Sequence, residues 1–362
     1  MSATSSIAFT RGVPPAEAFP VEDLADCAAG AVRNDPSVVL QYGKSSGYLP
    51  LRKWLAEQHG LDVEQVFVGN GSLQLMDLVC GLLLAPGDAA FVESPSYDRA
   101  ILTLRRHRAN VVGIPLAPDG VNLEALEAAV ATHRPKLFYI IGDFQNPSGV
   151  TTVAAKRRHI AALAEKHGFW IIEDVPYRRL RYYGEEEPTF LSLAPGRVLQ
   201  MSSFSKLLSP GMRTGYLLGP AEVVGRLAKV AEDTYITPVL PTQGIVYEYC
   251  RRGLLEPNIA RLRDLYRPKL EATLAALAAE LPGAEWATPE GGYFVGVTLP
   301  AGIDTPTLLA KAGEAGLVLT NGDGFFVEPP SRAFVRIPFC SLSPDEVAAG
   351  VARLGKIVRE HA

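Results

Sequence analysis

Short apolar runs alternate with amphipathic stretches between residues 47 and 219 of this chain. The apolar runs predict strands over Gln65–Val68, Ala89–Glu93, Asn110–Ile114, Lys136–Ile141, Trp170–Glu173, Val198–Met201 and Thr214–Leu218. The stretches between them predict helices over Leu51–Gly60, Gln74–Leu84, Tyr97–His107, Leu123–Thr132 and Val153–Gly168. Strands spaced by helices are typical of an α/β fold with a largely parallel sheet and helices on both faces.

The pattern changes near Pro241, where long helical stretches begin. Helices are predicted over Thr242–Arg252, Glu256–Glu280, Pro306–Ala315 and Pro344–Glu360, with strand-like runs in Gly291–Thr298 and Ala333–Phe339. This mixture indicates a smaller α+β domain. Pro238 and Pro241 mark the boundary. We therefore expect a large domain at 47–240, a small domain at 241–362, and an N-terminal arm with a helix (Val21–Asn34) at 1–46 that packs with the small domain.

The composition is that of an ordinary globular protein that acts on small molecules. Of the 362 residues, 48% are hydrophobic and 20% are charged, and the net charge is -4. Basic and acidic residues are interspersed along the chain, which argues against a nucleic-acid surface. No apolar run approaches the roughly 18–20 residues of a membrane span, and Met1–Thr10 has no signal-peptide features. The four cysteines lack metal-knuckle spacing. We expect no metal, reduced thiols and a cytoplasmic protein.

One stretch carries the strongest chemical signal. The run Val198–Met201 is followed by Ser203, Ser205 and Lys206, and Arg213 comes seven positions after the lysine. A lysine amine forms an imine with an aldehyde, while serine hydroxyls and an arginine hold a phosphate dianion. These residues therefore suit pyridoxal phosphate, an aldehyde that carries a phosphate. Taken alone, the stretch also fits a strand end on a solvated loop.

Small and aromatic residues follow two earlier strands. Gly71, Ser72 and Leu73 open a helix, where backbone N–H groups and the helix dipole favour a phosphate. Tyr97 follows the next strand and can stack on a planar ring. A glycine-rich turn and a core tyrosine are the alternatives. Because ligands gather at the carboxyl ends of strands in open α/β sheets, we expect these residues to share one site.

Hydrogen-bonding side chains follow the later strands. Asn146 lies in an Asn-Pro-Ser-Gly turn and can donate to a ring oxygen, as can Tyr177. Asp174 can pair with a protonated pyridine nitrogen, which makes the ring an electron sink. Arg336 lies between apolar neighbours and can bind a carboxylate in bidentate fashion. A turn without function, a helix N-cap aspartate and an edge-strand arginine are the alternatives.

In this order the residues resemble those of fold-type I pyridoxal-phosphate enzymes of the class I/II aminotransferases, closest to the branch of 2-aminoadipate aminotransferases and the aminotransferase-like halves of MocR-type regulators. The resemblance runs nearly end to end. The strings that carry it are Leu40–Gly43, Gly47–Arg52, Gln145–Gly149, Ser203–Lys206, Ser209–Arg213 and Pro289–Phe294. It implies the fold of that class, with a mostly parallel sheet in the large domain and a smaller α+β domain.

The resemblance also implies roles for single residues. Lys206 joins the cofactor as an aldimine and shuttles the proton at the substrate Cα, and Asp174 pairs with the pyridinium. The other implied cofactor contacts are Asn146 and Tyr177 on the ring oxygen, Tyr97 on the ring face, and Gly71, Ser72, Leu73, Ser203, Ser205 and Arg213 on the phosphate. Tyr42 resembles a tyrosine supplied by the neighbouring subunit, which implies a homodimer with shared active sites.

Substrate contacts follow in the same way. Arg336 takes the substrate α-carboxylate beside Asn146, and Arg11 and Gly12 lie in the loop that borders the substrate, where Arg11 either reaches a distal carboxylate or points to solvent. Two departures stand out: Leu73 replaces a glutamine common in the family, and Asn321–Gly324 differs from the usual loop.

The sequence thus predicts an aminotransferase that moves an α-amino group from an amino acid to a 2-oxo acid, 2-oxoglutarate being expected, by a ping-pong route. The same residues also suit a decarboxylase, a β-lyase or an oxidase. A ligand-sensing domain of a transcription regulator is a third alternative. The short stretch ahead of the substrate loop leaves no room for a DNA-binding domain, so a free-standing enzyme is expected.

Overall fold

The computed structural model describes residues 6–361, and its centre is an eight-stranded sheet in the order β2-β9-β8-β7-β6-β3-β4-β5. The strands are β2 Val66–Gly69, β3 Ala89–Ser94, β4 Asn110–Ala117, β5 Gly120–Val121, β6 Leu137–Ile140, β7 Trp170–Asp174, β8 Val198–Ser203 and β9 Gly215–Leu218. The pairings of β4, β3, β6, β7 and β8 are parallel. The predicted fold class is therefore confirmed.

Strand β9 departs from the expected parallel pattern. It pairs antiparallel with both β8 and β2, because the chain returns from β8 through the short loop that carries Lys206. A parallel return would need a long crossover connection, which this loop does not provide. The reversal brings the two ends of the Lys206 loop, Ser203 and Gly215, into register as sheet partners.

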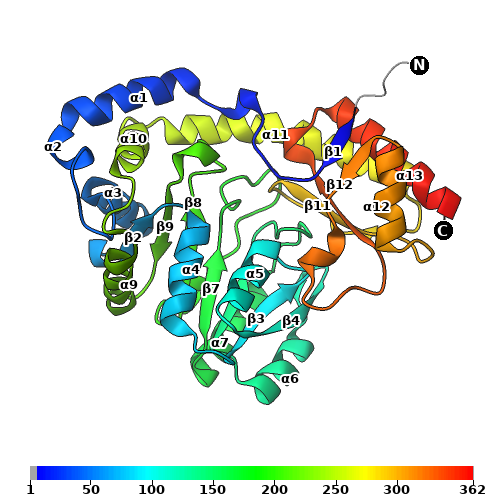
Figure 1. The fold of residues 1–362 in the computed structure, drawn as a ribbon, viewed down its shortest axis with the longest axis horizontal. Helices are drawn as coiled ribbons and strands as arrows, with labels where there is room; N and C mark the ends of the chain where they lie inside the picture. The colour runs from blue at the N-terminus through cyan, green and yellow to red at the C-terminus, as the bar shows by residue number, and fades with distance from the viewer. Residues whose placement is uncertain (1–5, 362) are drawn as a thin grey trace.

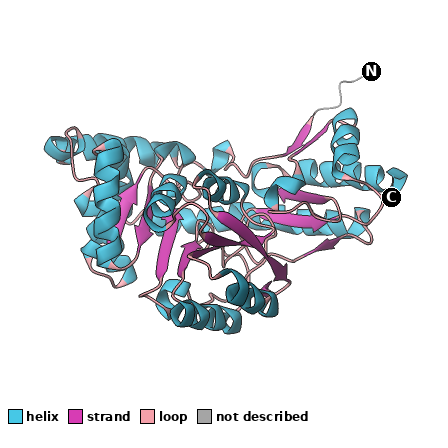
Figure 2. Cartoon of the chain, turned by 60° about the horizontal axis from the view of Figure 1, so that its bottom comes forward, coloured by secondary structure: helices cyan, strands magenta, loops and turns pink. Residues whose placement is uncertain are grey.

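Helices cover both faces of the sheet (Figures 1 and 2). On one face lie α4 Ser72–Leu83, α5 Asp98–Arg106 and α9 Ala221–Tyr235, and on the other lie α6 Leu123–His133, α7 Ala154–His167 and α8 Phe190–Leu193. The strands alternate accordingly: Leu137 and Tyr139 of β6 belong to the first core, and Phe138 and Ile140 to the second. Helix α9 was not predicted.

Local signals set several helix ends. Asn122 precedes α6 and accepts a hydrogen bond from the N–H of Ala125, which satisfies one of the unpaired donors of the first turn. Helix α7 ends at Gly168, whose φ of 78° closes the helix in the left-handed conformation. The predicted end of this helix at Gly168 is therefore confirmed.

A second, smaller body is built around the three-stranded antiparallel sheet β10-β11-β13. Its elements are β10 Glu285–Trp286, β11 Phe294–Thr298, α12 Thr305–Glu314, β12 Leu317–Leu319, β13 Phe334–Pro338 and α13 Pro344–His361. The helix α11, Leu255–Glu280, runs along the top of the view in Figure 1 and packs against α13. The predicted domain bounds stay a prediction.

The N-terminal segment packs against two different parts of the molecule. Strand β1, Ile7–Phe9, pairs in parallel with β12, as Figure 1 shows. Helix α1, Val21–Asn34, instead packs against α10, Leu240–Arg251, which lies beside α3, Leu49–His59. Residues 1–5 of the predicted arm lie outside the described part of the chain. The remaining short elements are α2 Pro36–Val39, η1 Ala16–Ala18, η2 Val63–Gln65, η3 Pro210–Met212, η4 Gly322–Phe325 and η5 Phe339–Ser341.

Three sequence-based expectations concern membrane-spanning helices, metal sites and the cysteines. Between residues 6 and 361, none of the helices combines the length and hydrophobicity of a membrane span. The same residues form no cluster of histidine, cysteine and carboxylate side chains that can hold a metal ion. The cysteines Cys27, Cys80, Cys250 and Cys340 are all buried and unbridged, which confirms the predicted free thiols.

Candidate active site

Gly71 and Arg213 meet at the N-terminus of α4. Gly71 has a φ of 94°, and a Cβ atom there would lie 2.4 Å from a terminal nitrogen of Arg213. Gly215, at the start of β9, is as close to the helix, because a Cβ atom there would lie 2.7 Å from the backbone nitrogen of Ser72. The two glycines therefore let the start of α4 and the Lys206 loop approach each other closely.

Two serine hydroxyls complete this group of residues, which is called the phosphate corner below and consists of Gly71, Ser72, Ser203, Ser205 and Arg213. Ser203 is the sheet partner of Gly215, and its Oγ lies 2.8 Å from Oγ of Ser205. Backbone N–H groups at a helix start, two hydroxyls and a guanidinium therefore converge, as a phosphate group requires. The predicted phosphate residues are brought together by the fold. Leu73 belongs to the same turn, but its side chain is exposed and contributes no polar group.

Asp174 ends β7 inside the protein. The Tyr139 hydroxyl donates a 2.7 Å hydrogen bond to Asp174 Oδ2, while Oδ1 is buried and has no hydrogen-bond partner among residues 6–361. Burial raises the pKa of Asp174 to about 6, although the Tyr139 hydrogen bond and the charge of Lys206 oppose this rise. A buried carboxylate oxygen without a partner is costly, so this one fits a cationic group such as a pyridinium nitrogen.

A small cavity is lined in part by Asp174. It is lined by Ser72, Leu73, Met76, Tyr97, Ala100, Tyr139 and Asp174. The predicted stacking residue Tyr97 and the predicted partner of the ring nitrogen, Asp174, thus face one space. Tyr97 is half-buried just before α5, where burial raises its pKa to about 12 and keeps its phenol protonated.

Lys206 is held by the N-terminal segment. Its Nζ atom donates a 2.9 Å hydrogen bond to the carbonyl oxygen of Gly12 and lies 5.4 Å from the centre of the Tyr293 ring. Burial lowers the pKa of Lys206, and the positive charges of Arg336 and Arg213 act in the same direction. A lowered pKa makes the neutral, nucleophilic amine available nearer to neutral pH.

Arg336 is buried in the middle of β13, between two aromatic rings. Its guanidinium carbon lies 4.6 Å from the ring centres of both Phe294 and Phe325. One terminal nitrogen donates to Asn146 Oδ1 at 2.9 Å, and the other donates to the carbonyl oxygen of Thr10 at 2.6 Å. Its Nε is buried without a partner in the described chain. Burial lowers the pKa of Arg336, and an incoming carboxylate would satisfy its remaining hydrogen-bond capacity.

The turn that carries Asn146 rests on a buried ionic cluster. Asp143 accepts hydrogen bonds from Arg157, Arg178 and Arg181 at 3.0 to 3.3 Å. Arg181 also donates to Glu290, at 2.5 Å, in the segment that leads to β11. Burial opposes ionisation of Asp143, yet the arginines hold its pKa below the usual value. The cluster therefore fixes the Asn146 turn and ties the large sheet to the smaller body.

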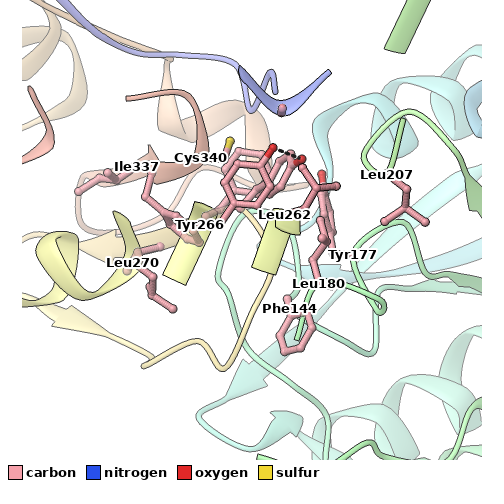
Figure 3. Close-up of a cluster of buried hydrophobic side chains, with 14 of the residues drawn as sticks. Phe144, Tyr177, Leu180, Leu207, Leu262, Tyr266, Leu270, Ile337 and Cys340 are labelled. Carbon is pink, nitrogen blue, oxygen red and sulfur yellow. Dashed lines mark hydrogen bonds between the residues drawn. The ribbon is translucent and has the colours of Figure 1, made fainter. Parts of the chain in front are cut away.

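Aromatic side chains pack together next to Lys206, whose Nζ atom lies 5.4 Å from the centre of the Tyr293 ring. Figure 3 shows two members of this group, Tyr177 and Tyr266. The Tyr177 ring lies 5.4 Å from the Tyr293 ring, and Tyr293 lies 5.0 Å from Tyr266. The Tyr293 hydroxyl is 3.2 Å from the Lys206 carbonyl oxygen and 3.1 Å from the Tyr266 hydroxyl, so it can donate to the first and accept from the second. Burial raises the pKa of Tyr177 well above its ordinary value, so its phenol stays protonated and able to donate.

Two predicted residues lie apart from this group. Tyr42 is 75% exposed, so it contributes nothing to the site of its own chain. The Arg11 side chain is also exposed, although its neighbours Thr10 and Gly12 contact Arg336 and Lys206 through their carbonyl oxygens. The alternative of a solvent-facing Arg11 therefore describes the structure without substrate.

Sequence reasoning assigned no site role to five residues that contact the predicted ones: Thr10, Tyr139, Tyr293, Phe294 and Phe325. Thr10 acts only through its backbone, which no side-chain pattern reveals. Tyr293 and Phe325 lie in glycine-rich segments, where contacts are set by the tertiary fold. Tyr139 had a usable signal, because a phenol inside an apolar strand needs a buried hydrogen-bond partner.

The donor set fits pyridoxal phosphate. The Gly71 corner offers a phosphate cradle, Asp174 offers an unpaired buried oxygen, and Lys206 offers an amine with a lowered pKa. No side-chain cluster in the described chain competes with this arrangement by holding a metal ion.

The comparisons with known proteins point the same way. A family model described as aminotransferase class I and II matches residues 7–354. A 2-aminoadipate transaminase from Thermus thermophilus is 34% identical over 360 residues, covering 98% of this chain and 90% of that protein. Aromatic-amino-acid aminotransferase 1 from Thermococcus litoralis is 32% identical over 367 residues, covering 98% and 88%.

A solved structure agrees with the fold. The crystal structure of an alpha-aminoadipate aminotransferase from Thermus thermophilus, complexed with N-(5'-phosphopyridoxyl)-L-leucine, matches with a TM-score of 0.92 at 32% identity. The match covers 98% of this chain and 92% of that chain.

Proposed function

Because the chain belongs to the class I and II aminotransferases, we propose that it uses pyridoxal phosphate to move an α-amino group from an amino acid to a 2-oxo acid. The observation that carries the proposal is the presence in one site of Lys206 and Asp174, whose charges act on each other without a direct contact between the two side chains. The amine has a lowered pKa, the carboxylate keeps one oxygen without a partner in the described chain, and each affects the pKa of the other.

The cofactor and the protein divide the chemistry. When bound, pyridoxal phosphate supplies an aldehyde that forms imines with amines and a ring that withdraws electrons from the substrate Cα. Lys206 would hold the cofactor covalently, and its amine would hold and move the proton at the substrate Cα. Asp174 would keep the ring nitrogen protonated, and Asn146 and Tyr177 would hydrogen-bond the ring oxygen.

Arg336 would bind and orient the substrate. Its fork can take the α-carboxylate in bidentate fashion, and the flanking rings of Phe294 and Phe325 exclude water from this ion pair. The carbonyl oxygens of Thr10 and Gly12 accept hydrogen bonds from Arg336 and Lys206. A substrate carboxylate bound to Arg336 would compete with the Thr10 carbonyl for the same guanidinium.

The reaction would alternate between two half-reactions, with 2-oxoglutarate as the proposed acceptor. A screen of amino donors, followed by the absorbance of the cofactor, tests this. Release of a 2-oxo acid with conversion of the cofactor to its amine form is expected. Release of carbon dioxide or ammonia instead would point to a decarboxylase or a lyase and contradict transamination.

Covalent attachment is tested separately. Borohydride reduction and digestion should yield a cofactor-modified peptide that contains Lys206, and Lys206→Ala should lose both this peptide and turnover. Lys269→Ala is a suitable control, since Lys269 is buried but bonded to Glu17 and to the carbonyl of Cys340. A modified peptide from elsewhere in the chain would overturn the assignment of Lys206.

The active enzyme is proposed to be a homodimer with shared sites. The exposed side chains of Leu40, Tyr42, Ile236 and Val239 support it. They lie beside the phosphate corner, because Gly43 bonds Thr237 and Val239 bonds Asn70. An apolar surface of this kind is typical of an interface.

A mixing experiment tests the shared site. In a hybrid of a Lys206→Ala chain and a Tyr42→Ala chain, one of the two sites would contain both an intact lysine and an intact tyrosine. Activity should therefore return on mixing two weak or inactive variants. If Tyr42 served its own chain, or if the protein stayed monomeric, mixing would restore nothing.

A further inference from the structure

Tyr139 and Asp174 come from neighbouring parallel strands. In the register of β6 and β7, Tyr139 pairs with Ile172. Asp174 lies two residues further along β7 and therefore on the same face as Ile172. Both residues line the same cavity, and the Tyr139 hydroxyl donates to Asp174 Oδ2 at 2.7 Å.

The hydrogen bond makes the two carboxylate oxygens of Asp174 inequivalent. Oδ2 is occupied by Tyr139, whereas Oδ1 has no partner among residues 6–361 and belongs to a residue that lines the cavity. The terminal torsion of an aspartate is broad and roughly two-fold without such a contact. A single fixed hydrogen bond selects one orientation of the carboxylate.

We propose that Tyr139 is a positioning residue for the cofactor: its hydroxyl locks Asp174 so that the free oxygen faces the pyridine nitrogen. The inference rests on the proposed function. Tyr139 itself would not touch the cofactor nitrogen, and its effect would pass through Asp174.

The surroundings explain why this hydroxyl matters. Both residues are buried, Tyr139 at 1% and Asp174 at 6% exposure, so water does not replace the lost hydrogen bond easily. Removing one partner of a buried, charged hydrogen bond leaves the other unsatisfied. Without the hydroxyl, both oxygens of Asp174 would lack a protein partner, and its pKa would rise further because the hydrogen bond now lowers it.

Tyr139→Phe removes the hydroxyl and keeps the ring that packs in the core. The variant should bind pyridoxal phosphate about tenfold or more weakly, the loss typical of a hydrogen bond to a charged group. The affinity of the apoprotein is measured by fluorescence titration. Tyr182→Phe is the matched control, since it also loses a 2.7 Å hydrogen bond of a buried hydroxyl, here to the Gly292 carbonyl. The control should keep wild-type affinity.

A cofactor analogue separates positioning from general damage. Deazapyridoxal phosphate has carbon in place of the ring nitrogen, so Asp174 has nothing to pair with. Tyr139→Phe and the wild type should bind this analogue equally well. Equal losses for both cofactors would show that Tyr139 only supports the fold, and no loss for either would show that its hydroxyl is dispensable. Both results overturn the inference.

A double-variant cycle gives a second test. In an Asp174→Asn background, adding Tyr139→Phe should change pyridoxal phosphate affinity by less than about twofold, because the two residues act as one unit. If the losses of affinity in the two single variants simply added up in the double variant, Tyr139 would not act through Asp174. If the wild type binds no pyridoxal phosphate at all, the proposed function fails; if the wild type binds it and Tyr139→Phe matches the wild type, only the present inference fails.

Discussion

The carbonyl oxygen of Gly12 accepts a 2.9 Å hydrogen bond from Nζ of Lys206, although 194 positions separate the two residues. Thr10, two residues earlier, binds Arg336 in the same way at 2.6 Å. One backbone segment therefore contacts the proposed attachment point of the cofactor and the proposed anchor of the substrate. Under the proposed function, substrate binding and the position of this segment would be coupled, because both would use Arg336.

Gly12→Ala should weaken amino-acid binding. A Cβ atom at this position would lie 2.3 Å from Cζ of Phe294, the ring that stacks on Arg336. Overpacking of this kind typically costs roughly 1–3 kcal/mol, so we expect KM for the donor to rise about tenfold while Lys206 still attaches the cofactor. Steady-state kinetics and the reduced-peptide assay measure the two effects.

Gly196→Ala provides the control for that variant, because a Cβ atom at Gly196 has no heavy atom within 4 Å. It should match the wild type in both assays. An unchanged KM in Gly12→Ala would show that the segment moves away from Phe294 without consequence for substrate binding.

Gly71→Ala should weaken binding of the cofactor phosphate. The substitution forces an alanine to a φ of 94° and places its Cβ 2.4 Å from Arg213. We expect pyridoxal phosphate affinity to fall at least tenfold, which an equilibrium titration of the apoprotein measures. Gly87→Ala is the control closest in φ, since Gly87 has a φ of 89° and a Cβ atom there would have no heavy atom within 4 Å. A comparable loss in Gly87→Ala would show that the effect comes from backbone strain and not from the phosphate corner.

Asp174→Asn should stabilise the apoprotein above pH 6. The folded pKa of Asp174 is raised to about 6, above the unfolded value of about 3.9. Ionisation of the folded protein is therefore opposed, and stability falls as the pH rises from about 4 to 6. The carboxylate costs on the order of 3 kcal/mol at neutral pH, a cost that the amide variant avoids.

Thermal and denaturant unfolding of the apoprotein between pH 4 and 8 measures this difference. The gain should shrink as the pH falls towards 4 and vanish below the unfolded pKa of about 3.9, where both states of the wild type hold the proton. The variant should lose cofactor affinity at every pH. Asp26→Asn, a surface exchange on α1, should show no such profile. A pH-independent loss of stability in Asp174→Asn would contradict the prediction.

Asp143→Asn should destabilise the protein by about 3–5 kcal/mol, the usual cost of leaving buried cations without their anion. Three arginines share this carboxylate, two of them almost fully buried. The folded pKa of Asp143 is depressed, so its contribution persists above pH 4 and is lost as the pH falls through the folded value. Glu186→Gln removes an exposed partner of Arg178 and should cost less than about 1 kcal/mol. Similar losses for both variants would show that the buried cluster contributes no more than a surface pair.

The sequence predicted most of the large sheet and the residues at its edge. Apolar runs and helical stretches coincide with β2 to β4, β6 to β9 and α3 to α7 within a few residues, because burial on two faces leaves a strong local pattern. The two-residue strand β5 was not predicted. The polar residues that follow those strands converge in the structure for the same reason: parallel strands bring their carboxyl ends to one edge.

What the sequence did not predict depends on distant contacts. Strand β1 has three residues, too few for a periodic signal, and exists because β12 lies beside it. The antiparallel course of β9 follows from the length of a loop rather than from its own residues. The phenol of Tyr139 indicated that a hydrogen-bond partner lies nearby, but only the pairing with the neighbouring strand reveals Asp174 as that partner.

The pairing of β1 with β12 also has a consequence for synthesis. Residues 7–9 leave the ribosome early, yet Leu317–Leu319, their hydrogen-bonding neighbours, are translated about three hundred residues later. Strand β1 can pair only after β12 has been synthesised. The backbone segment that contacts Lys206 and Arg336 therefore reaches its final position late in the life of the nascent polypeptide.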